Sequence, residues 1–444
     1  MLKQSRLEQE LEDKKPLYTE AQARAEAERC LYCVDAPCIK ACPTQIDIPT
    51  FIKKIASGNV NGSAKTIFEQ NLLGYSCARV CPVEVLCVGD CVYNGWDRDP
   101  IQIGRLQRFA TETATAKKSA SDLLPKKPRK PDGQRKKVAL IGAGPASLAC
   151  AGYLALEGHE AVIFEKRAVS GGLNTTGIAP YKLQADAAIH EVEWVKSLGV
   201  EIKNGVTVGP AASNATYTGK KLLEEYDAVF IGVGLGDDSK LGIPGEDAAG
   251  VYGATAWIET MKLELPKGTK LGRVLVIGGG NTAIDVAREC ALLGAESVTM
   301  AYRRGVKDMS GYVHEMEGAR IEGVKLELNA QPVAVNKDAS GKVTGVMFQR
   351  TKDGRPVPGT DFEIHCDMVA LAIGQSKLRD LANAFDGVEL DKRGCIVADP
   401  ATAQTGNPKV FAGGDCINGG KEVVNAVADG RNAARVLISR WHQQ

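Results

Sequence analysis

Eight of the thirteen cysteines lie between Cys30 and Cys91, in two groups whose spacing suits metal ligation. The first group reads C-x2-C-x4-C-x3-C and the second reads C-x3-C-P-x4-C-x3-C. Closely spaced thiolates bind soft metals, and a Cys-Pro step is typical of runs that hold [4Fe–4S] clusters. In such runs the fourth cysteine of one run ligates the other cluster. The spacing therefore predicts two four-iron clusters with crossed ligand sets.

The crossed assignment gives each cluster its own thiolates. The predicted ligands of the first cluster are Cys30, Cys33, Cys38 and Cys91. The predicted thiolate ligands of the second cluster are Cys42, Cys81 and Cys87. From the residues alone, Cys77 is the candidate for the missing fourth ligand. The alternative is a pair of zinc sites, but zinc prefers paired C-x2-C units, and none of the five histidines lies near either group.

A glycine-rich turn between a strand and a helix marks a first dinucleotide site at residues 138–166. Such glycines let the backbone approach a pyrophosphate, whose charge the helix N-terminus stabilises. Glu165 follows the second glycine by 21 residues, where an acid hydrogen-bonds a ribose hydroxyl. The predicted FAD-binding residues here are Gly142, Gly144, Pro145, Ala146, Ser147, Glu165, Lys166, Gly172 and Leu173.

The same pattern returns at residues 274–304, with a different residue type at its end. The second strand ends at Arg303 and Arg304, where the first copy has an acid. Arginine pairs with a 2′-phosphate that a carboxylate would repel, so this copy favours NADP over NAD. The alternative is that Arg303 and Arg304 are ordinary surface arginines. The predicted nucleotide-binding residues are Gly278, Gly280, Asn281, Thr282, Ala283, Arg303 and Arg304.

A third glycine-rich segment, residues 410–434, is expected to complete the flavin site. Asp415 follows a short strand and a glycine pair, where its carboxylate would accept a hydrogen bond from a ribityl hydroxyl. A helix beginning near Val423 would point its positive end at the isoalloxazine. Cys416 has no C-x-x-C mate and is interpreted as a spectator. The predicted cofactor set therefore also includes Gly374, Gly414, Asp415, Val423 and Val424, and no catalytic acid or base is predicted, because hydride transfer to flavin needs none.

The elements that position these residues are short helices first and βαβ units afterwards. Thr19 and Gln22 form a predicted capping box for the helix that leads to the first cysteines. The expected fold class is α+β and α/β: a helical iron–sulfur domain, then two Rossmann-like domains of the disulfide-reductase type. The predicted segments are a helical iron–sulfur domain (1–120), a linker (121–136), an FAD domain in two parts (137–250 and 376–444) and an inserted NAD(P) domain (251–375).

Composition limits the classes of partner. A chain of 444 residues predicts two or three domains, and a formal net charge of +1 gives no pull toward nucleic acid or an anionic membrane. The basic run at 126–130 lacks interleaved aromatics and is interpreted as a solvated linker. No run of 18 apolar residues occurs, and the charged N-terminus lacks an apolar signal core. A cytoplasmic protein is expected, with its cysteines in metal or redox chemistry.

Four motifs carry a resemblance to a known family: CLYCVDAPCIKACPTQIDI (30–48), CARVCPVEVLCVGDC (77–91), PIQIGRLQRFATE (100–112) and IGAGPASLACA (141–151). With them the chain resembles the small NAD(P)H-oxidising subunit of bacterial dihydropyrimidine dehydrogenase. It is more distantly similar to the small subunit of NADPH-dependent glutamate synthase. In the dehydrogenase family a glutamine is the fourth ligand of the second cluster, and Gln107 stands at the matching place. Glutamate synthase small subunits have a glutamate there, so Gln107 favours the pyrimidine enzyme.

The resemblance implies an electron-input subunit. NAD(P)H would reduce FAD, and electrons would cross two [4Fe–4S] clusters to an FMN-containing large subunit that reduces uracil or thymine, in a hetero-oligomer such as a heterotetramer. The family's arginine-bearing NADP loop is matched at Arg303 and Arg304, but Ser310 stands where the single-chain enzyme has a further arginine, which leaves the choice between NADP and NAD open.

Three rival functions remain. In the first, the chain would pass electrons by the same chemistry to a glutamate synthase large subunit or to a ferredoxin. A disulfide reductase needs a C-x-x-C pair on the nicotinamide unit, and Cys290 and Cys366 offer none. A flavin-bearing redox sensor would not need two nucleotide sites together with two clusters.

Overall fold

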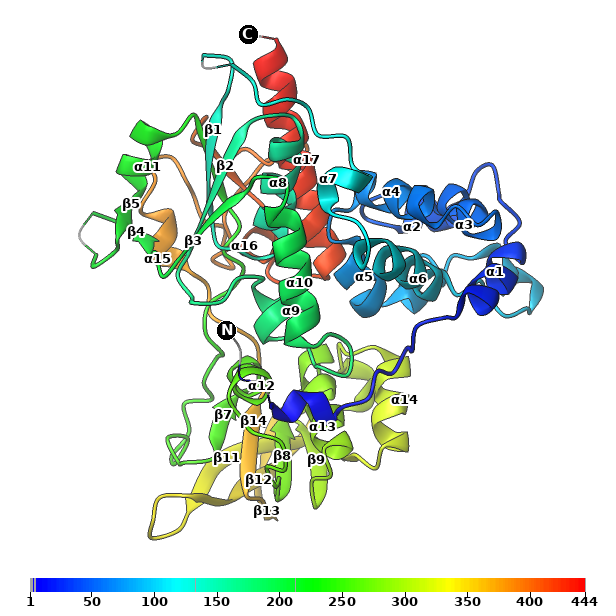
Figure 1. Ribbon diagram of the computed structural model, residues 1–444. Helices are drawn as coiled ribbons and strands as arrows, with labels where there is room; N and C mark the ends of the chain where they lie inside the picture. The colour runs from blue at the N-terminus through cyan, green and yellow to red at the C-terminus, as the bar shows by residue number, and fades with distance from the viewer. Residues whose placement is uncertain (1–2, 4, 132, 212, 444) are drawn as a thin grey trace. The chain divides into compact units, whose positions relative to one another are not determined.

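The computed structural model describes residues 3, 5–131, 133–211 and 213–443. The chain divides into two compact units (Figure 1). Unit 1 comprises Met1–Lys14, Thr176–Ala185 and Gly236–Ser376, and unit 2 comprises Lys15–Thr175, Asp186–Leu235 and Lys377–Gln444. Over the described residues, no helix has both the length and the apolar character that crossing a bilayer requires.

The N-terminal part of unit 2 is a group of short helices with cysteines at or near their ends. Helix α1 (Glu20–Glu28) begins at the predicted capping box, in which Thr19 and Gln22 exchange hydrogen bonds. The apolar faces of the later helices, with Phe51 and Ile67 fully buried, make a common core. The other helices are α2 (Pro37–Ala41), α3 (Ile48–Ala56), α4 (Val60–Gln70), α5 (Gly74–Val80), α6 (Ile103–Thr115) and α7 (Ala120–Leu123), with 3-10 turns η2 (Val83–Val85) and η3 (Val92–Trp96).

The rest of unit 2 is built on a five-stranded parallel sheet in the order β15-β6-β1-β2-β3. These strands are β1 (Lys137–Ile141), β2 (Glu160–Glu165), β3 (Glu201–Asn204), β6 (Ala228–Ile231) and β15 (Val410–Ala412). The remaining elements are α8 (Pro145–Leu156), α9 (Leu173–Thr176), α10 (Ala185–Lys196), β4 (Val208–Gly209), β5 (Tyr217–Thr218), α11 (Gly219–Glu225), α15 (Arg379–Ala382), α16 (Asp415–Asn418) and α17 (Val423–His442). Because the strands are parallel, their carboxyl ends share one edge, where such sheets bind nucleotides.

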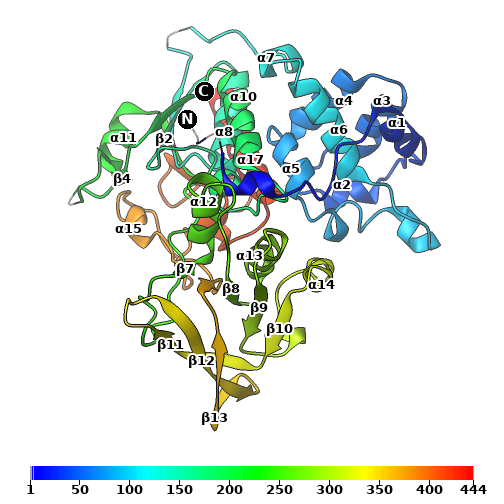
Figure 2. The same ribbon diagram turned by 60° about the horizontal axis from the view of Figure 1, so that its bottom comes forward.

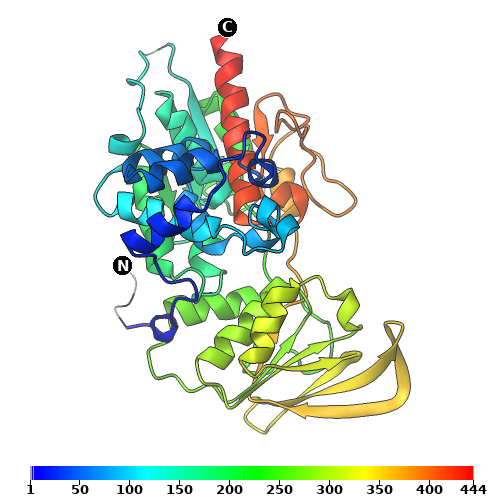
Figure 3. The same ribbon diagram turned by 90° about the vertical axis from the view of Figure 1, so that its right-hand side faces the viewer.

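The helical part and this sheet share one hydrophobic core. Phe68 and Leu72, from the helical part, belong to the same buried cluster as Leu154 and Val195 from the sheet's own helices. The packing is close enough that a Cβ at Gly152 would lie 2.5 Å from Cδ1 of Leu72. Figure 3 shows blue and light-blue helices of the helical part lying alongside the red helix α17. Unit 2 is therefore one body that combines both predicted domains.

The segment predicted as a linker lies against the sheet domain. Leu123 and Leu124 are buried in the shared core. The backbone N–H of Lys127 donates to the carbonyl of Leu156 at 2.8 Å, and its ammonium pairs with Glu157 at 2.6 Å. This connection thus combines linker-like composition with specific contacts.

Unit 1 contains a second five-stranded parallel sheet, in the order β10-β9-β8-β14-β7. Its strands are β7 (Val251–Gly253), β8 (Arg273–Ile277), β9 (Ser297–Tyr302), β10 (Lys325–Leu328) and β14 (Met368–Leu371). Helices α12 (Ala254–Leu263), α13 (Asn281–Leu292) and α14 (Val313–Ile321) accompany it, with the 3-10 turn η4 (Val306–Asp308). An antiparallel sheet of β11 (Ala330–Lys337), β12 (Val343–Lys352) and β13 (Arg355–His365) completes the unit (Figure 2).

The start of the chain groups with unit 1, although the sequence placed it in the iron–sulfur domain. Leu7, in the 3-10 turn η1 (Leu7–Glu10), is fully buried in the core of unit 1. Arg6 and Glu8 form a buried ion pair at 2.7 Å. Lys262 donates to the carbonyls of Ile178 and Leu183, at 2.9 and 2.8 Å. The sequence could not indicate this placement, because no local pattern marks Leu7 or the buried charges. The residues that Leu7 and Lys262 contact lie far away in the sequence.

Candidate iron–sulfur and dinucleotide sites

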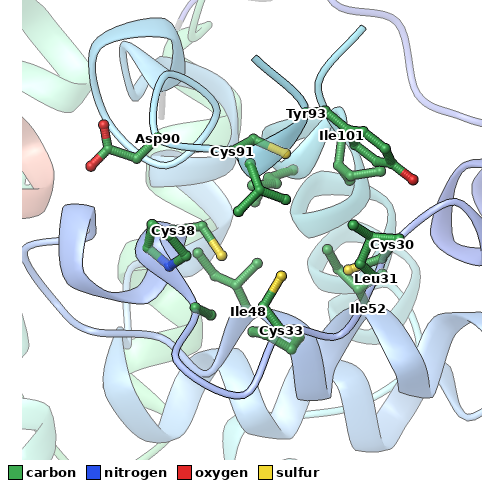
Figure 4. Close-up of a pocket in the computed structure, with 15 residues that line it drawn as sticks. Cys30, Leu31, Cys33, Cys38, Ile48, Ile52, Asp90, Cys91, Tyr93 and Ile101 are labelled. Carbon is green, nitrogen blue, oxygen red and sulfur yellow. The ribbon is translucent and has the colours of Figure 1, made fainter. Parts of the chain in front are cut away.

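The four cysteines predicted to hold the first cluster line one pocket of the helical domain. They come from three places: the end of α1, the helix α2 and the residue before η3. Figure 4 shows their sulfur atoms pointing into the pocket from different sides. Apolar side chains, among them Ile48, Ile52 and Ile101, form the remaining wall. The residues that meet there are Cys30, Cys33, Cys38 and Cys91.

Burial and mutual proximity disfavour the thiolate form in this pocket. Burial first, and then the neighbouring thiols of Cys30 and Cys91, raise the pKa of Cys38 to about 12. Burial also raises the pKa of Cys30. Thiols of this kind become thiolates when a cation replaces their protons, so metal binding here is coupled to proton release.

The donor set suits a cluster better than a single ion. Among the described residues, no three His, Cys, Asp or Glu side chains converge closely enough to hold one metal ion. The sulfurs of the predicted first-cluster ligands, here the first group (Cys30, Cys33, Cys38 and Cys91), instead surround a space (Figure 4). Four thiolates around an apolar cavity fit a [4Fe–4S] cube, whose irons each take one outer ligand.

The cysteines around the predicted second cluster, here the second group, are Cys42, Cys77, Cys81 and Cys87, and they are also brought together. The thiol of Cys77 hydrogen-bonds that of Cys81, which is the first cause of the raised pKa of Cys81, followed by burial and by Cys42 and Cys87. Burial, followed by the thiol of Cys42, raises the pKa of Cys87. The three predicted ligands and the fallback residue Cys77 therefore lie in one neighbourhood.

Gln107 is held in a way that suits a ligand. It lies on α6 and is 9 % exposed. Its Nε2 donates to the carbonyl of Gly74, at the start of α5, over 2.9 Å. Within the described part of the chain, no donor hydrogen-bonds its Oε1. Because the nitrogen end is fixed, the oxygen is the end that remains for iron, and Gln107 and Cys77 both stay candidates for the fourth position.

The second group lies beside the sheet domain of its unit. Cys77 is buried in the core that both parts share, and Cys81 packs against it. The guanidinium of Arg431, on α17, donates to the carbonyl of Thr44 at 2.5 Å. The hydroxyl of Thr44 in turn lies 3.3 Å from the sulfur of Cys42. Cys30, Cys38 and Cys91 pack against the core of the iron–sulfur helices, to which Cys42 and Cys87 also belong.

The first glycine turn has the geometry of a pyrophosphate cradle. Gly142 has φ +84°, and a Cβ there would lie 2.9 Å from the carbonyl oxygen of Gly232. Gly144 caps α8, whose first turn contains Pro145, Ala146 and Ser147. A Cβ at Gly172 would lie 2.8 Å from the Cα of Gly144. Side chains larger than hydrogen are thus excluded from the backbone that a phosphate would approach. Leu173 then begins α9.

The acid predicted to bind a ribose lies against this turn. Glu165 is buried at the end of β2, and its two oxygens accept from the N–H groups of Ala143 at 2.6 Å and Arg167 at 2.8 Å. Each carboxylate oxygen has further lone pairs, so these contacts leave acceptor capacity for a hydroxyl. The next residue, Lys166, is exposed.

The C-terminal segment adds a second acid to the same sheet edge. Asp415 follows Gly414, which has φ +78°, and its Oδ1 accepts the N–H of Lys421 at 3.0 Å. Burial raises the pKa of Asp415, and the nearby Asp429 raises it further. Asp429, which the sequence analysis missed, accepts the N–H of Gly414 at 2.9 Å. Val423 and Val424 begin the 20-residue helix α17, as predicted.

The glycine turn of unit 1 repeats the cradle. A Cβ at Gly278 would lie 2.4 Å from the carbonyl oxygen of Ala372, and Gly280 caps α13. The first turn of α13 contains Thr282, Ala283 and Asn281, whose Oδ1 accepts the N–H of Tyr312 at 2.9 Å. Gly374, predicted as a cofactor contact, lies elsewhere in the unit with φ +108° and accepts the N–H of Ser239 at 2.9 Å.

Arg303 and Arg304 follow β9 and are exposed. The guanidinium of Arg304 lies 5.5 Å from the ring centre of Tyr302. A Cβ at Gly280 would come within 3.4 Å of the hydroxyl of Ser310, so that serine lies next to the glycine turn. The position therefore offers a neutral hydroxyl beside two exposed cations.

Two family models match the chain. Residues 7–119 match "Dihydropyrimidine dehydrogenase domain II, 4Fe-4S cluster", and residues 136–430 match "Pyridine nucleotide-disulphide oxidoreductase". The glutamate synthase [NADPH] small chain of Escherichia coli K12 is 36 % identical over 445 aligned positions, which cover 95 % of this chain and 92 % of that protein. The chain belongs to the glutamate synthase small chain-like family of FAD and iron–sulfur oxidoreductases.

Relatives of this chain include subunits of a differently named enzyme. The β subunit of an NADP(+)-dependent formate dehydrogenase from Moorella thermoacetica is 36 % identical, over 94 % of this chain and 60 % of that protein. The thioredoxin reductase of T. acidophilum shares the fold, with a TM-score of 0.56 at 24 % identity, over 69 % of this chain and 99 % of that one. The predicted fold class is thereby confirmed: a helical iron–sulfur domain followed by Rossmann-type domains.

Proposed function

We propose that this chain is the electron-input subunit of a larger oxidoreductase. It would bind NAD(P)H in unit 1 and FAD in unit 2, and pass electrons through two four-iron clusters to a partner subunit. The observation that carries the proposal is the different placement of the two cysteine groups. Of the cysteines around the second site, Cys77 and Cys81 pack in the core that includes the flavin-type sheet, while the predicted ligands of the first cluster line a separate pocket.

The bound cofactors supply the redox chemistry, since FAD accepts a hydride and releases electrons singly to iron–sulfur clusters. The protein's residues bind and orient. The turns at Gly142 and Gly278 admit the phosphates, and the N-termini of α8 and α13 stabilise their charge. Glu165 and Asp415 accept hydrogen bonds from cofactor hydroxyls, which fixes the position of the flavin.

NADPH is the donor that the site favours, because Arg303 and Arg304 are exposed cations that pair with no carboxylate among the described residues. Guanidinium groups there would pair with a 2′-phosphate. Ser310 adds only a hydroxyl, so the preference rests on the two arginines.

The partner is proposed to be an FMN-containing large subunit. The small chains of glutamate synthase cover nearly the whole length of this chain and favour a partner of the glutamate synthase type. Gln107, which resembles the dihydropyrimidine dehydrogenase ligand, and the family model over residues 7–119 favour a pyrimidine-reducing partner instead. Reconstitution with each type of large subunit, scored by NADPH-driven reduction of thymine or by formation of glutamate, distinguishes the two.

The central test is composition followed by titration. Anaerobically purified protein is expected to contain about eight irons, about eight sulfides and one FAD per chain, as two four-iron clusters require. Anaerobic addition of NADPH should bleach the flavin. Zinc in place of iron, or flavin that neither NADPH nor NADH reduces, would contradict the proposal.

A further inference from the structure

A buried carboxylate joins the sheet domain to the second cysteine group. Glu191 lies on α10 and is 3 % exposed. Its Oε1 accepts the N–H groups of Tyr75 and Ser76, both at 3.1 Å, and its Oε2 accepts the hydroxyl of Ser76. The donors are 115 and 116 residues earlier in the chain, in the first turn of α5. One side chain thus caps a helix that belongs to a different domain.

Burying the Glu191 carboxylate costs free energy, and an apolar side chain would satisfy the packing at this position equally well. Val192 and Val195, on the same helix, are buried among apolar neighbours. Burial raises the pKa of Glu191 to about 7, against the lowering effect of the bonds from Ser76 and Tyr75 and of the charge of Arg79. A buried carboxylate is tolerated when its hydrogen bonds satisfy groups that would otherwise be unpaired. Here those groups are the first N–H donors of α5, which have no partner within the helix.

The turn that Glu191 caps also holds the candidate iron ligand. The carbonyl of Gly74, one residue before Tyr75, accepts Nε2 of Gln107 at 2.9 Å. The helix that begins at Gly74 contains Cys77, and its C-cap is Cys81. Movement of this turn would therefore displace both the amide and the thiols of the second group.

The surrounding charges tie the same turn to α6. Arg79 donates to the hydroxyl of Tyr75 at 3.2 Å and pairs with Glu112 at 2.8 Å. Arg108, one residue after Gln107, also pairs with Glu112. On the α10 side, the ring of His190 lies 5.5 Å from that of Tyr75.

We propose that Glu191 is a positioning residue for the second cluster. By fixing the first turn of α5, it keeps the Gly74 carbonyl where it holds the amide of Gln107, with Oε1 free for iron. Groups that orient metal ligands from outside the ligand set commonly control affinity and potential. The inference rests on the proposed function, in which the second cysteine group binds a four-iron cluster.

The first test removes all three acceptor contacts. Glu191→Ala is expected to lower the iron content from about eight to about four per chain, because only the second cluster loses its support. Bleaching of the flavin by NADPH should be unchanged, since the glycine turn and Glu165 are not touched. Glu193→Ala is the matched control: Glu193 lies two residues away on α10, is exposed and pairs with Lys196.

A gentler variant keeps the test informative if the alanine protein does not fold. Glu191→Gln retains the shape and an acceptor oxygen, so both clusters should be present. Loss of the negative charge should shift the reduction potential of the second cluster to a more positive value at pH 8, and by less at pH 6. Ser76→Ala removes one donor and should give a smaller shift than Glu191→Gln.

The outcomes separate this inference from the proposed function. A wild-type protein without a second cluster overturns the proposed function. A wild-type protein with two clusters, whose Glu191→Ala and Glu191→Gln variants keep all their iron and an unchanged electron paramagnetic resonance spectrum and potential, overturns the role of Glu191 alone. Equal effects of Glu191→Ala and Glu193→Ala would also overturn it.

Discussion

The cysteines predicted around the two clusters lie in different surroundings. In the second group Cys42, Cys77 and Cys87 are buried, and α17 and α10 of the sheet domain reach it through Arg431 and Glu191. The four predicted ligands of the first cluster, Cys30, Cys33, Cys38 and Cys91, are partly exposed, and three of them pack against the core of the iron–sulfur helices. Local spacing therefore sets which residues gather, while packing between domains decides which group faces the flavin side.

This difference in surroundings suggests the order in which electrons would pass through the two proposed clusters. A group that shares a core with the flavin-type sheet is suited to receive electrons, and a partly exposed group is suited to deliver them. Leu31 and Val34, next to the first cysteines, are 46 % and 105 % exposed. The proposed exit would therefore lie beside exposed apolar side chains. The predictions below test the comparison, beginning with the largest expected effect.

Removing one thiol from each group should break the relay at different points. Cys87→Ala is expected to abolish reduction of both clusters by NADPH, because the cluster that would receive electrons first is lost. Cys33→Ala should leave the second cluster present and reducible. Electron paramagnetic resonance after anaerobic addition of NADPH, together with iron analysis, measures both. Reducible iron in the Cys87→Ala protein would reverse the proposed order.

The fourth ligand of the second group can be assigned by a paired substitution. Gln107→Ala should lose the second cluster, about half of the iron, because its oxygen is the proposed ligand. Cys77→Ala should retain the iron, since the Cys77 thiol bonds Cys81 in a structural role. Iron content and the absorbance of the clusters are the measurements. The opposite pattern would make Cys77 the ligand.

Exposure to air should attack the groups unequally. Oxidants reach exposed sulfur more easily than buried sulfur. We therefore expect the first cluster's resonance signal to decay several-fold faster than that of the second when the purified protein is aerated. Equal decay rates would show that the difference in burial does not control access.

The net stability that Glu191 contributes should fall as the pH rises, because ionising a buried carboxyl carries a desolvation cost. The pKa of Glu191 is raised to about 7 in the folded protein, from an ordinary value near 4.5. A carboxyl with a raised folded-state pKa contributes most stability below pH 4.5 and loses it as the pH rises through 7. Such a shift corresponds to about 3 kcal/mol at most. The melting temperature of the wild type, relative to that of Glu191→Gln, should therefore fall between pH 5 and pH 8, and a constant difference would contradict this.

Arg431 provides a test of the contact between α17 and the second group. Replacing it with methionine leaves the carbonyls of Thr44 and Gln70 without their cationic donor. Hydrogen bonds to charged groups contribute about 1.5–3 kcal/mol each. The melting temperature should fall accordingly, whereas Arg435→Met, which removes an exposed contact to Gln70, should change it little. Similar losses in the two variants would argue against a specific role for Arg431.

Local patterns predicted much of the fold. The capping box at Thr19, the glycine turns before α8 and α13, and the beginning of α17 at Val423 are features of a few adjacent residues, and the structure contains each of them. The crossed grouping of cysteines also follows the spacing: Cys91 lines a pocket with the first group, and Cys42 lies with the second.

Contacts between distant segments could not be predicted in this way. Glu191, Arg431 and Asp429 are single charged residues on helices, where the sequence suggests a solvated surface. Their burial depends on Ser76, Thr44 and Gly414.

The assignment of the first fourteen residues to unit 1 matters for gene design. The chain passes between the two units after residues 14, 175, 185, 235 and 376, so neither unit corresponds to one continuous stretch of gene. An expression fragment that starts at residue 15 would retain every cluster cysteine and yet remove Leu7 from the core around Trp257. Fusion tags and truncations at the start of this protein would therefore perturb unit 1, which contains the predicted NAD(P) site, although the nearest motif in the sequence is the iron–sulfur one.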